Sequence, residues 1–467
     1  MTTPAEKGRA RPSLQHAFSS LESPEYRPWF FAQVFSSSGT MTQGVALSWL
    51  VLRLTGNGVD LGLMTACTFL PMLILGPYGG TLVDRFDRRR LLIVTQTLLL
   101  VLATVLSVLI ATGLIQLWML FAIAALTGCV SAPDNTARQV YVIDLVGTER
   151  LASAISLYEV VLNISRVAGP AVGGALLATV GVGACCAFNA ASYLQPLWVL
   201  LGHRPSHVAA AAAVPKPAKA PPGQLRAGVR YAWRNRPIRV SLFLAAASGM
   251  LFNLGVSLVL LATRVFHLGG GGYGLMMAVF GIGALPGALL ASSGSGRPTG
   301  RSVGVLAAAT GVVILGTARA PELWLVMLGL AVTGCLSIWF IAQANTLVQL
   351  TADPAMRGRV MGLWTMALPG TEPATSPFVG YMSQTFGARD GFSLSGAALL
   401  LTAAIGWRAL TDRAAADDTT RDDPGLGEIV DADEPAAVAV PAADALAETA
   451  ALAGTAALAD PPLADTP

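Results

Sequence analysis

Residues 80–90 read Gly-Thr-Leu-Val-Asp-Arg-Phe-Asp-Arg-Arg-Arg, and this short basic stretch joins two long apolar segments. The segments, 61–78 and 91–114, are each close to the ~20 apolar residues that span a hydrocarbon core. Arginine-rich loops between membrane helices stay on the cytoplasmic side. The stretch therefore predicts a cytoplasmic connection between two transmembrane helices, and its charges suggest a gate at that surface.

The composition indicates the same class. Of 467 residues, 54% are hydrophobic and 12% are charged, whereas an ordinary soluble domain has roughly 25% charged residues. The N-terminus shows no cleavable signal sequence. All five cysteines lie in apolar segments without the spacing of metal ligands. We expect an all-α polytopic membrane protein without disulfides, metals or other cofactors.

Apolar segments predict twelve transmembrane helices, with centres near residues 42, 70, 102, 126, 168, 193, 250, 282, 310, 333, 370 and 401. With the N-terminus inside, only five of the 30 Lys and Arg residues fall outside the cytoplasmic segments: Arg53, Arg264, Arg319, Arg389 and, within a span, Arg166. This asymmetry favours an even number of spans with both termini cytoplasmic. Eleven spans would place several basic loops outside.

The second half of the chain repeats the first weakly. Asn135-Thr136 is followed by Asp144 and, six residues on, by Arg150; Asn345-Thr346 is followed by Asp353 and, six residues on, by Arg359. Many transporters are built from such repeats. We predict five parts: a cytoplasmic N-terminal segment (1–27), an N-terminal six-helix bundle (28–202), a cytoplasmic linker with a basic amphipathic helix (203–239), a C-terminal six-helix bundle (240–411) and a disordered acidic cytoplasmic tail (412–467).

The linker helix places Arg226, Arg230 and Arg234 on one face, beside a face with Val229 and Trp233. Such a helix lies on the inner membrane surface, drawn by anionic lipid, or makes a contact that locks the two halves. Both readings stay open.

The chain resembles the major facilitator superfamily of transporters from about residue 28 to residue 412. The family's loop motif G-x-x-x-D-R-x-G-R-R-R is matched at Gly80, Asp84, Arg85, Arg88, Arg89 and Arg90, with Asp87 where the family usually has Gly. Together with the stretch from Asn135 to Ala154, this is similar to the branch of enterobactin exporters and macrolide efflux proteins. The resemblance implies twelve transmembrane helices in two pseudo-symmetric six-helix bundles. It also implies that Asp84, Arg85 and Arg88 hold the cytoplasmic side closed. The alternative is that the arginines of this loop only fix the orientation of the helices in the membrane.

A second motif, at Gly169, Pro170, Gly173 and Gly174 in the fifth span, resembles the antiporter motif of drug and siderophore exporters. In these exporters the motif is preceded by spaced glycines, but the upstream positions here are Ser156 and Ser165, which are small but not glycine, so the match is partial. Glycines and proline in a membrane helix also serve close packing and bending in general.

Charged residues inside spans are candidates for ion coupling, because exposing them to lipid is costly. Glu159, Asn163 and Arg166 share a face of the fifth span, and Glu372 lies among helix breakers in the eleventh. Glu159 also suits a solvated interface position, and Glu372 a water-filled helix break. The fourth span, taken as 117–132, holds no charge, although many proton-coupled relatives have an arginine there. Asp134, just beyond it, would join the cytoplasmic charges or cap the helix.

Polar and aromatic residues at mid-membrane depth are candidates for the substrate path: Gln43, Trp49, Asn163, Asn253, Trp339 and Gln343. Such residues also serve as interface belts or contacts between helices. The resemblance implies a secondary active exporter of small amphipathic molecules, driven by proton antiport in the cell membrane. We expect no enzymatic activity, a monomer in the lipid bilayer and no nucleic-acid partner. An importer or symporter on the same fold, or a non-transporting sensor or scaffold, remains an alternative.

Overall fold

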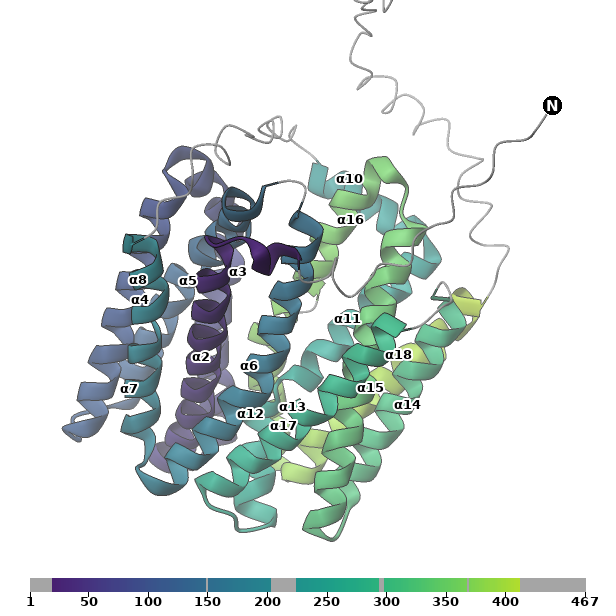
Figure 1. Ribbon diagram of the computed structural model, residues 1–467. Coiled ribbons are helices and arrows are strands. Elements are labelled where there is room, and N and C mark those ends of the chain that lie inside the picture. Colours follow the sequence, from purple (N-terminus) through teal and green to yellow (C-terminus); the bar gives the residue numbers. More distant parts are fainter. Residues whose placement is uncertain (1–18, 148–149, 203–223, 294–297, 368, 412–467) are drawn as a thin grey trace, which may run out of the picture. The chain divides into compact units, whose positions relative to one another are not determined.

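The computed structural model describes residues 19–147, 150–202, 224–293, 298–367 and 369–411, which are helical without any strand (Figure 1). The first half contains η1 (Ser19–Glu22), α2 (Tyr26–Thr55), α3 (Gly58–Arg85), α4 (Arg88–Ala111), α5 (Leu117–Val146), α6 (Leu151–Thr179), α7 (Val182–Ser192) and α8 (Leu194–Gly202). The second half contains α10 (Gln224–Arg234), α11 (Arg236–Phe252), α12 (Leu254–Leu260), η2 (Leu261–Val265), α13 (Gly270–Ser293), α14 (Gly300–Arg319), α15 (Leu323–Thr351), α16 (Pro354–Ala367), η3 (Pro369–Thr371), α17 (Glu372–Thr385) and α18 (Ala388–Thr411). Most of the predicted N-terminal segment, the linker before α10 and the tail from residue 412 lie outside the described residues.

Ten segments of the described chain are long and apolar enough to cross a membrane, so the protein is a multi-pass membrane protein. They contain ten of the twelve predicted centres. The other two centres fall in α2, which is rich in Ser, Thr and Gln, and in α16–η3–α17, where the helix is interrupted. The count of twelve therefore stays a prediction at these two positions.

Polar side chains cap several of these helices where they begin. Asn57 accepts a hydrogen bond from the backbone N of Val59 (3.0 Å) at the start of α3. Asp87 accepts one from the backbone N of Arg90 (2.8 Å) at the start of α4. Each cap satisfies an N–H that has no partner in the first helical turn. The turns between spans are thus short and well defined.

The helix α5 is longer than predicted. It runs through Pro133 to Val146, so that Asp134 and Arg138 lie inside it. The expectation of an uncharged fourth span that ends at residue 132 is wrong. Proline usually interrupts a helix by removing one hydrogen bond and crowding the preceding turn, but here α5 continues through it, with α3 and α4 packed against it.

Each half is held by its own helix pairs. In the first half α3 packs on α5, and α2 packs on α6 and α7. In the second half α13 packs on α15, and α14 packs on α18. We call the end of the helices with the turn at residues 86–87 the arginine-rich end, and the end with the turn at residues 56–57 the opposite end.

The two halves meet along α3–α17 and along α6–α13. Glycines allow these contacts, because a Cβ at Gly58 would lie 2.8 Å from the Gly380 carbonyl oxygen, and one at Gly174 would lie 2.8 Å from Gly274 Cα. Both contacts are near the opposite end. Toward the arginine-rich end, by contrast, a Cβ at Gly76 or Gly80 of α3 would meet open space. The halves are therefore closed against each other at the opposite end.

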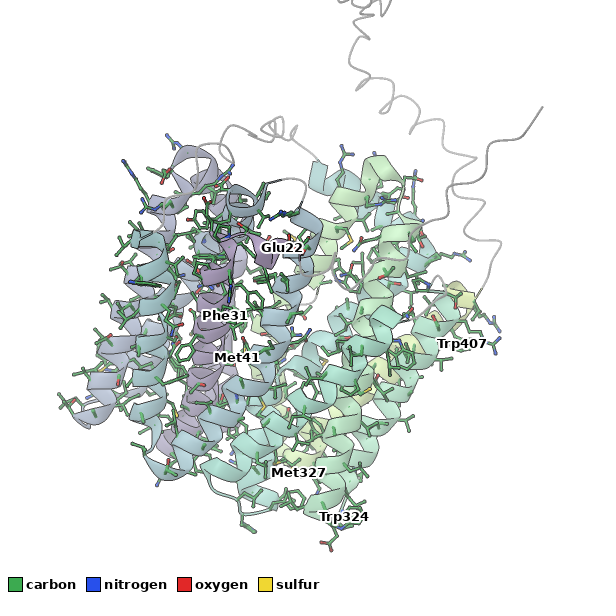
Figure 2. The ribbon with its side chains drawn as sticks, in the orientation of Figure 1. Glu22, Phe31, Met41, Trp324, Met327 and Trp407 are labelled. Carbon is green, nitrogen blue, oxygen red and sulfur yellow. The ribbon has the colours of Figure 1, made fainter. Side chains whose placement is uncertain are left out.

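Large apolar side chains cover the outside of the helices. Phe31 (58% exposed) and Met41 (41%) lie along α2 (Figure 2). Trp324 (64%) lies near the start of α15, which is at the opposite end of the molecule. Apolar faces of this extent are costly in water but match a lipid environment, with tryptophan favoured at its borders.

Candidate functional site

The arginines of the loop motif make contacts within the first half. Arg88 forms an ion pair with Asp144 at the end of α5 (2.5 Å). Arg89 donates from Nε to the carbonyl oxygen of Leu200 (2.7 Å), and thus to the last turn of α8. The motif therefore joins the start of α4 to the ends of two other spans. Its expected role as a lock between the two halves stays a prediction.

The other residues of the motif differ in exposure and packing. Arg85 and Arg90 are exposed, and the side chain of Asp84 lies outside the described part. Gly80 faces open space, and the glycine that brings α3 close to α5 is its neighbour Gly79, where a Cβ would lie 3.1 Å from the Ala132 carbonyl oxygen. The close approach of α3 to α5 thus occurs one residue before the Gly80 of the motif.

The backbone conformation at residue 87 explains why an aspartate can stand where the family usually has glycine. Its φ of −61° is open to any L-residue, so that no glycine is required. Its carboxylate caps α4 instead. The negative charge also lies at a helix N-terminus, where it is favourable.

A buried ionic cluster in the first half was missed by the sequence analysis. Asp134 (1% exposed) pairs with Arg138 Nε (2.6 Å) and accepts hydrogen bonds from Thr95 Oγ1 (2.6 Å) and Gln96 Nε2 (2.8 Å) of α4. Arg138 also donates from Nη1 to Gln33 Oε1 of α2 (2.8 Å). Asp134 is therefore neither a helix cap nor part of the surface network. The i, i+4 spacing of Asp134 and Arg138 could have revealed the pair, had the helix been extended past Pro133.

The glycine motif of α6 serves two interfaces. Gly169 and Gly173 face α2, where Thr42 Oγ1 donates to the Gly169 carbonyl oxygen (2.8 Å). Gly174 faces Gly274 of α13 in the other half. Pro170 lies inside the helix, where it removes one hydrogen bond. Ser165, upstream, contacts Ser38 of α2 (3.4 Å). The side chain of Ser156 is outside the described part. The motif is thus a packing surface on both sides of α6.

Arg166 lies at mid-length of α6, one turn before Pro170. Its Nη1 donates to Asn163 Oδ1 (3.4 Å), and its backbone lies against Gly281 of α13. The side chain of Glu159 is not described. The structure therefore brings together two of the three residues predicted for this face, at the interface between the halves.

Glu372 is the first residue of α17, directly after the helix break at η3. It is half-buried, and no ion pair to it occurs in the described part of the chain. The segment η3–α17 packs against α3 of the first half. Glu372 thus lies in an interrupted helix, as the helix-breaking residues predicted, and the structure adds that this helix packs at the interface between the halves.

Two predicted path residues are engaged in contacts between helices. Gln43 Oε1 accepts from Asn189 Nδ2 (2.8 Å), and Asn253 Nδ2 donates to Thr375 Oγ1 (3.0 Å). Ser376 also donates to Asn253. These amides hold helices together, one of the two readings that the sequence allowed.

Two others, one turn apart on α15, are different. Trp339 Nε1 and Gln343 Oε1 are buried, and neither has a hydrogen-bond partner in the described part. Buried polar atoms normally have a hydrogen-bond partner, so these two atoms are suited to bond a water molecule or a polar group of a ligand.

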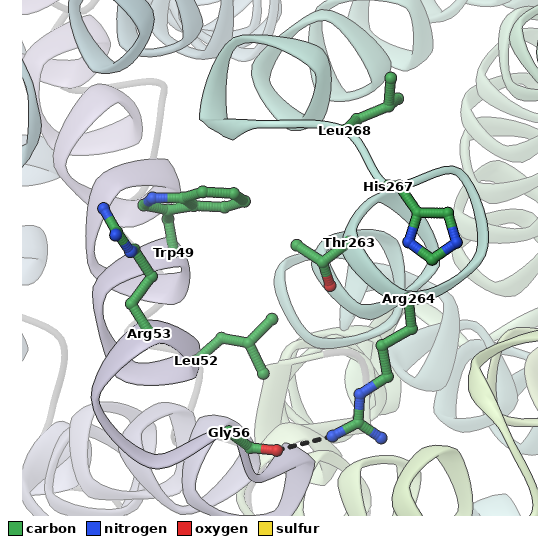
Figure 3. Close-up of a pocket in the computed structure, with 8 residues that line it drawn as sticks. All are labelled: Trp49, Leu52, Arg53, Gly56, Thr263, Arg264, His267 and Leu268. Atoms are coloured by element: carbon green, nitrogen blue, oxygen red, sulfur yellow. Dashed lines mark hydrogen bonds between the residues drawn. The ribbon is translucent and has the colours of Figure 1, made fainter.

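Trp49 lines a crevice between α2 and the η2 region at the opposite end, with a volume of about 450 Å³ (Figure 3). Arg53 and Arg264 give this crevice a positive charge, and His267 also lines it. Arg264 Nη2 donates across the halves to the Gly56 carbonyl oxygen (2.6 Å) and within its own half to Gln384 Oε1 (2.7 Å).

Gln384 Oε1 also accepts from the backbone N of Gly58 (3.1 Å). Two hydrogen bonds therefore join the halves here, and we call Arg264, Gln384 and their partners Gly56 and Gly58 the latch. Sequence analysis placed Arg264 in an outer loop but gave no sign of these partners.

No cluster of three or more His, Cys, Asp or Glu side chains that would suit a metal ion occurs in the described part of the chain. The fold and these sites can be compared with those of known proteins. The family model described as "Transmembrane secretion effector" matches residues 15–438. The multidrug efflux pump Tap of Mycobacterium tuberculosis is 27% identical over 394 residues, which cover 78% of this chain and 88% of Tap. The enterobactin exporter EntS of Citrobacter koseri is 26% identical over 352 residues, 73% of this chain and 81% of EntS.

Among solved structures, a bacterial homologue of the human lysosomal transporter Spinster, in an inward-facing and unoccupied conformation, superposes with a TM-score of 0.67. It is 14% identical and covers 90% of this chain and 100% of its own, so it supports the fold alone. The fold neighbours and the family are transporters, not enzymes. The chain belongs to the transmembrane secretion effector family of the major facilitator superfamily.

Proposed function

We propose that the protein is a secondary active exporter of small amphipathic molecules, such as drugs, siderophores or other secondary metabolites. Export is exchanged for proton entry by alternating access across the cell membrane, with both termini and the arginine-rich end in the cytoplasm. The names of the relatives Tap and EntS support the substrate class and the direction. The arginines of the 86–90 turn support the orientation.

The observation that carries the proposal is Glu372. A carboxylate that is half-buried in an interrupted helix, at an interface between two halves that must move, gains or loses solvation as the halves rock. Asp134 is less suited, because protonating it would break a buried pair with Arg138. Glu372 makes no ion pair in the described part, so its protonation breaks no ion pair there.

Trp339 and Gln343 support a substrate contact on α15, because their buried polar atoms have no described protein partner. An aromatic ring with one donor and one acceptor suits an amphipathic ligand, whose binding site needs apolar walls and few polar groups. Arg166, across the interface on α6, would favour ligands with an acidic group.

The test uses everted membrane vesicles whose interior is acidified by respiration and followed with a pH-sensitive dye. Siderophores, macrolides and cationic dyes are added one by one. We expect some of them to release protons from vesicles with the wild-type protein, and Glu372→Gln to abolish this release at equal expression.

Glu322→Gln is the matched control, because Glu322 is an exposed carboxylate at the start of α15. This variant is expected to release protons as the wild type does. Undiminished release by Glu372→Gln would remove Glu372 from the mechanism. Substrate-driven transport that proceeds without any proton movement would contradict proton antiport itself.

A further inference from the structure

The short helix α10 and the start of α11 form a bend at the arginine-rich end, which we call the elbow (residues 229–243). Asn235 lies between the two helices, and its side chain accepts from the backbone N of Ile238 (3.3 Å), so that it caps α11. The main contacts of α10 are with α16 and α11, both in the second half. The alternative reading of α10, as a lock between the halves, is not supported by these contacts.

The aromatic face of the elbow borders the lipid. Trp233 is 60% exposed and packs edge-on against Phe243 of α11 at 5.9 Å between ring centroids. Phe243 is itself 49% exposed on a membrane-spanning helix, where its exposed face meets acyl chains. Trp233 therefore lies at the level where the span leaves the hydrocarbon, the position that tryptophan prefers.

One arginine lies against this tryptophan, and three others are close to it in the sequence. The guanidinium of Arg239 lies 5.7 Å from the Trp233 ring, and its Nη1 donates to the Trp233 carbonyl oxygen (3.0 Å). Arg230, Arg234 and Arg236 are exposed. No Asp or Glu occurs in the sequence from Gln224 to Phe252, so no acidic residue of this segment offsets the charge.

The other side of α10 is attached to the beginning of α16. Tyr231 donates from its hydroxyl to Asp353 Oδ2 (3.1 Å), and the same hydroxyl accepts from the backbone N of Asp353 (3.1 Å). Burial raises the pKa of Tyr231, so its hydroxyl stays protonated and able to donate at neutral pH. Asp353 directly precedes α16, and its carbonyl oxygen accepts the first hydrogen bond of that helix from the N of Arg357 (2.8 Å). A shift of α10 is thus passed to the helix that leads to η3.

We propose that the elbow is a binding site for the headgroup of acidic phospholipids, in which Arg230, Arg234 and Arg236 hold the phosphate and Trp233 and Phe243 contact the acyl chains. Charge complementarity and the continuity of Trp233 with the lipid-facing side of α11 both select this occupant. Lipid bound there sets the position of α16 through Tyr231 and Asp353. The site acts whatever molecule the protein transports.

Lipid binding is measured on the purified full-length protein in detergent by native mass spectrometry, with phosphatidylglycerol or phosphatidylethanolamine added. A basic residue near an anionic surface contributes about fivefold in affinity. We expect the double variant Arg230→Gln/Arg234→Gln to lower phosphatidylglycerol binding by more than tenfold and to leave phosphatidylethanolamine binding unchanged.

The double variant Arg85→Gln/Arg90→Gln is the control, because it removes the same charge from two exposed arginines at the same end of the molecule. It is expected to retain most of the phosphatidylglycerol binding. An equal loss in both double variants would indicate attraction by net charge alone and would overturn the site, as would equal binding of the two lipids by the wild type.

The link to α16 is tested by hydrogen–deuterium exchange of residues 354–367 in nanodiscs with and without phosphatidylglycerol. Exchange in the wild type is expected to slow when this lipid is present. Tyr231→Phe should still bind the lipid but lose the effect on α16, because phenylalanine cannot bond to Asp353. An identical lipid response in Tyr231→Phe would disprove the link.

Discussion

Replacement of Arg264 by alanine is expected to open the opposite end of the protein. The side chain provides one of the two hydrogen bonds of the latch that cross between the halves, to the Gly56 carbonyl oxygen at 2.6 Å. It also orients Gln384, the acceptor of the other crossing bond, from Gly58. Arg264→Ala therefore removes one bond and weakens the second.

The size of the effect follows from these contacts. A hydrogen bond from a charged group contributes about 1.5–3 kcal/mol when it is shielded from water. Arg264 is exposed, so solvent reduces this contribution, and we take about 1–2 kcal/mol for the latch. The ratio of molecules open at the opposite end to molecules closed there should then rise about 5- to 30-fold.

The assay is double electron–electron resonance between spin labels on the two halves, in a background without the five native cysteines. Leu114 and Trp324 are suitable label sites, because both are exposed at the opposite end, one in each half. The distance distribution of Arg264→Ala should gain a longer component. Gln384→Ala should act in the same direction, and the double variant should show less than the sum, since the two side chains share one contact.

Arg319→Ala is the matched control. Arg319 is another exposed arginine near the same end, but its ion pair with Asp390 (2.7 Å) joins α14 to α18 within the second half. Its loss should leave the distances between the halves unchanged. The reasoning is refuted if Arg264→Ala leaves the distribution of a correctly folded protein as it was, or if Arg319→Ala changes it equally.

Two further predictions concern the first half. Asp134→Asn should strongly lower the thermal unfolding midpoint in detergent, because breaking a buried ion pair costs about 3–5 kcal/mol. The double variant Asp134→Leu/Arg138→Met should recover part of this loss, because it removes both charges. A double variant less stable than the single one would contradict this account. Asp87→Ala should lose the cap of α4, worth about 1 kcal/mol, whereas Asp87→Gly should lose only a few tenths. Amide exchange at residues 88–92 measures the cap, and exchange in Asp87→Ala as slow as in the wild type would show that the carboxylate does not stabilise α4.

Much of the fold is predictable because hydropathy is a local property. The segments near residues 102 and 310 are apolar along a whole helix, and each is found as a span, α4 and α14. The break before Glu372 is also local, since proline and glycine act on their own turn. These features need no knowledge of which helices are neighbours.

The sites were harder to predict because they depend on partners far away in the sequence. Arg264 and Gly56 are 208 residues apart, and nothing in either stretch marks them as partners. The cluster around Asp134 is a second case, because Gln33 and Thr95 come from two other helices. The expected span ended at residue 132, just before Pro133, whereas the helix continues through this proline to Val146.

The two ends of the protein are stabilised in different ways, and this difference bears on how transport is driven. At the arginine-rich end the ion pair Arg88–Asp144 stiffens the first half, and Tyr231–Asp353 stiffens the second. At the opposite end the latch and the glycine contacts join one half to the other. These contacts suit the alternating access that we propose, in which two stiff bodies separate at the latch.

The energy needed for this separation can be compared with what an ion gradient supplies. One elementary charge that crosses a potential of about 100 mV releases about 2.3 kcal/mol. The latch, at about 1–2 kcal/mol, is of this size. When the glycine contacts separate, packing between helices is replaced by packing against lipid or substrate. This replacement changes the free energy less, because lipid tails are as apolar as the helix faces. If Glu372 carries one proton per cycle, as we propose, the free energy released by that proton matches the cost of opening the latch, and a protein with several such latches would need more charges per cycle.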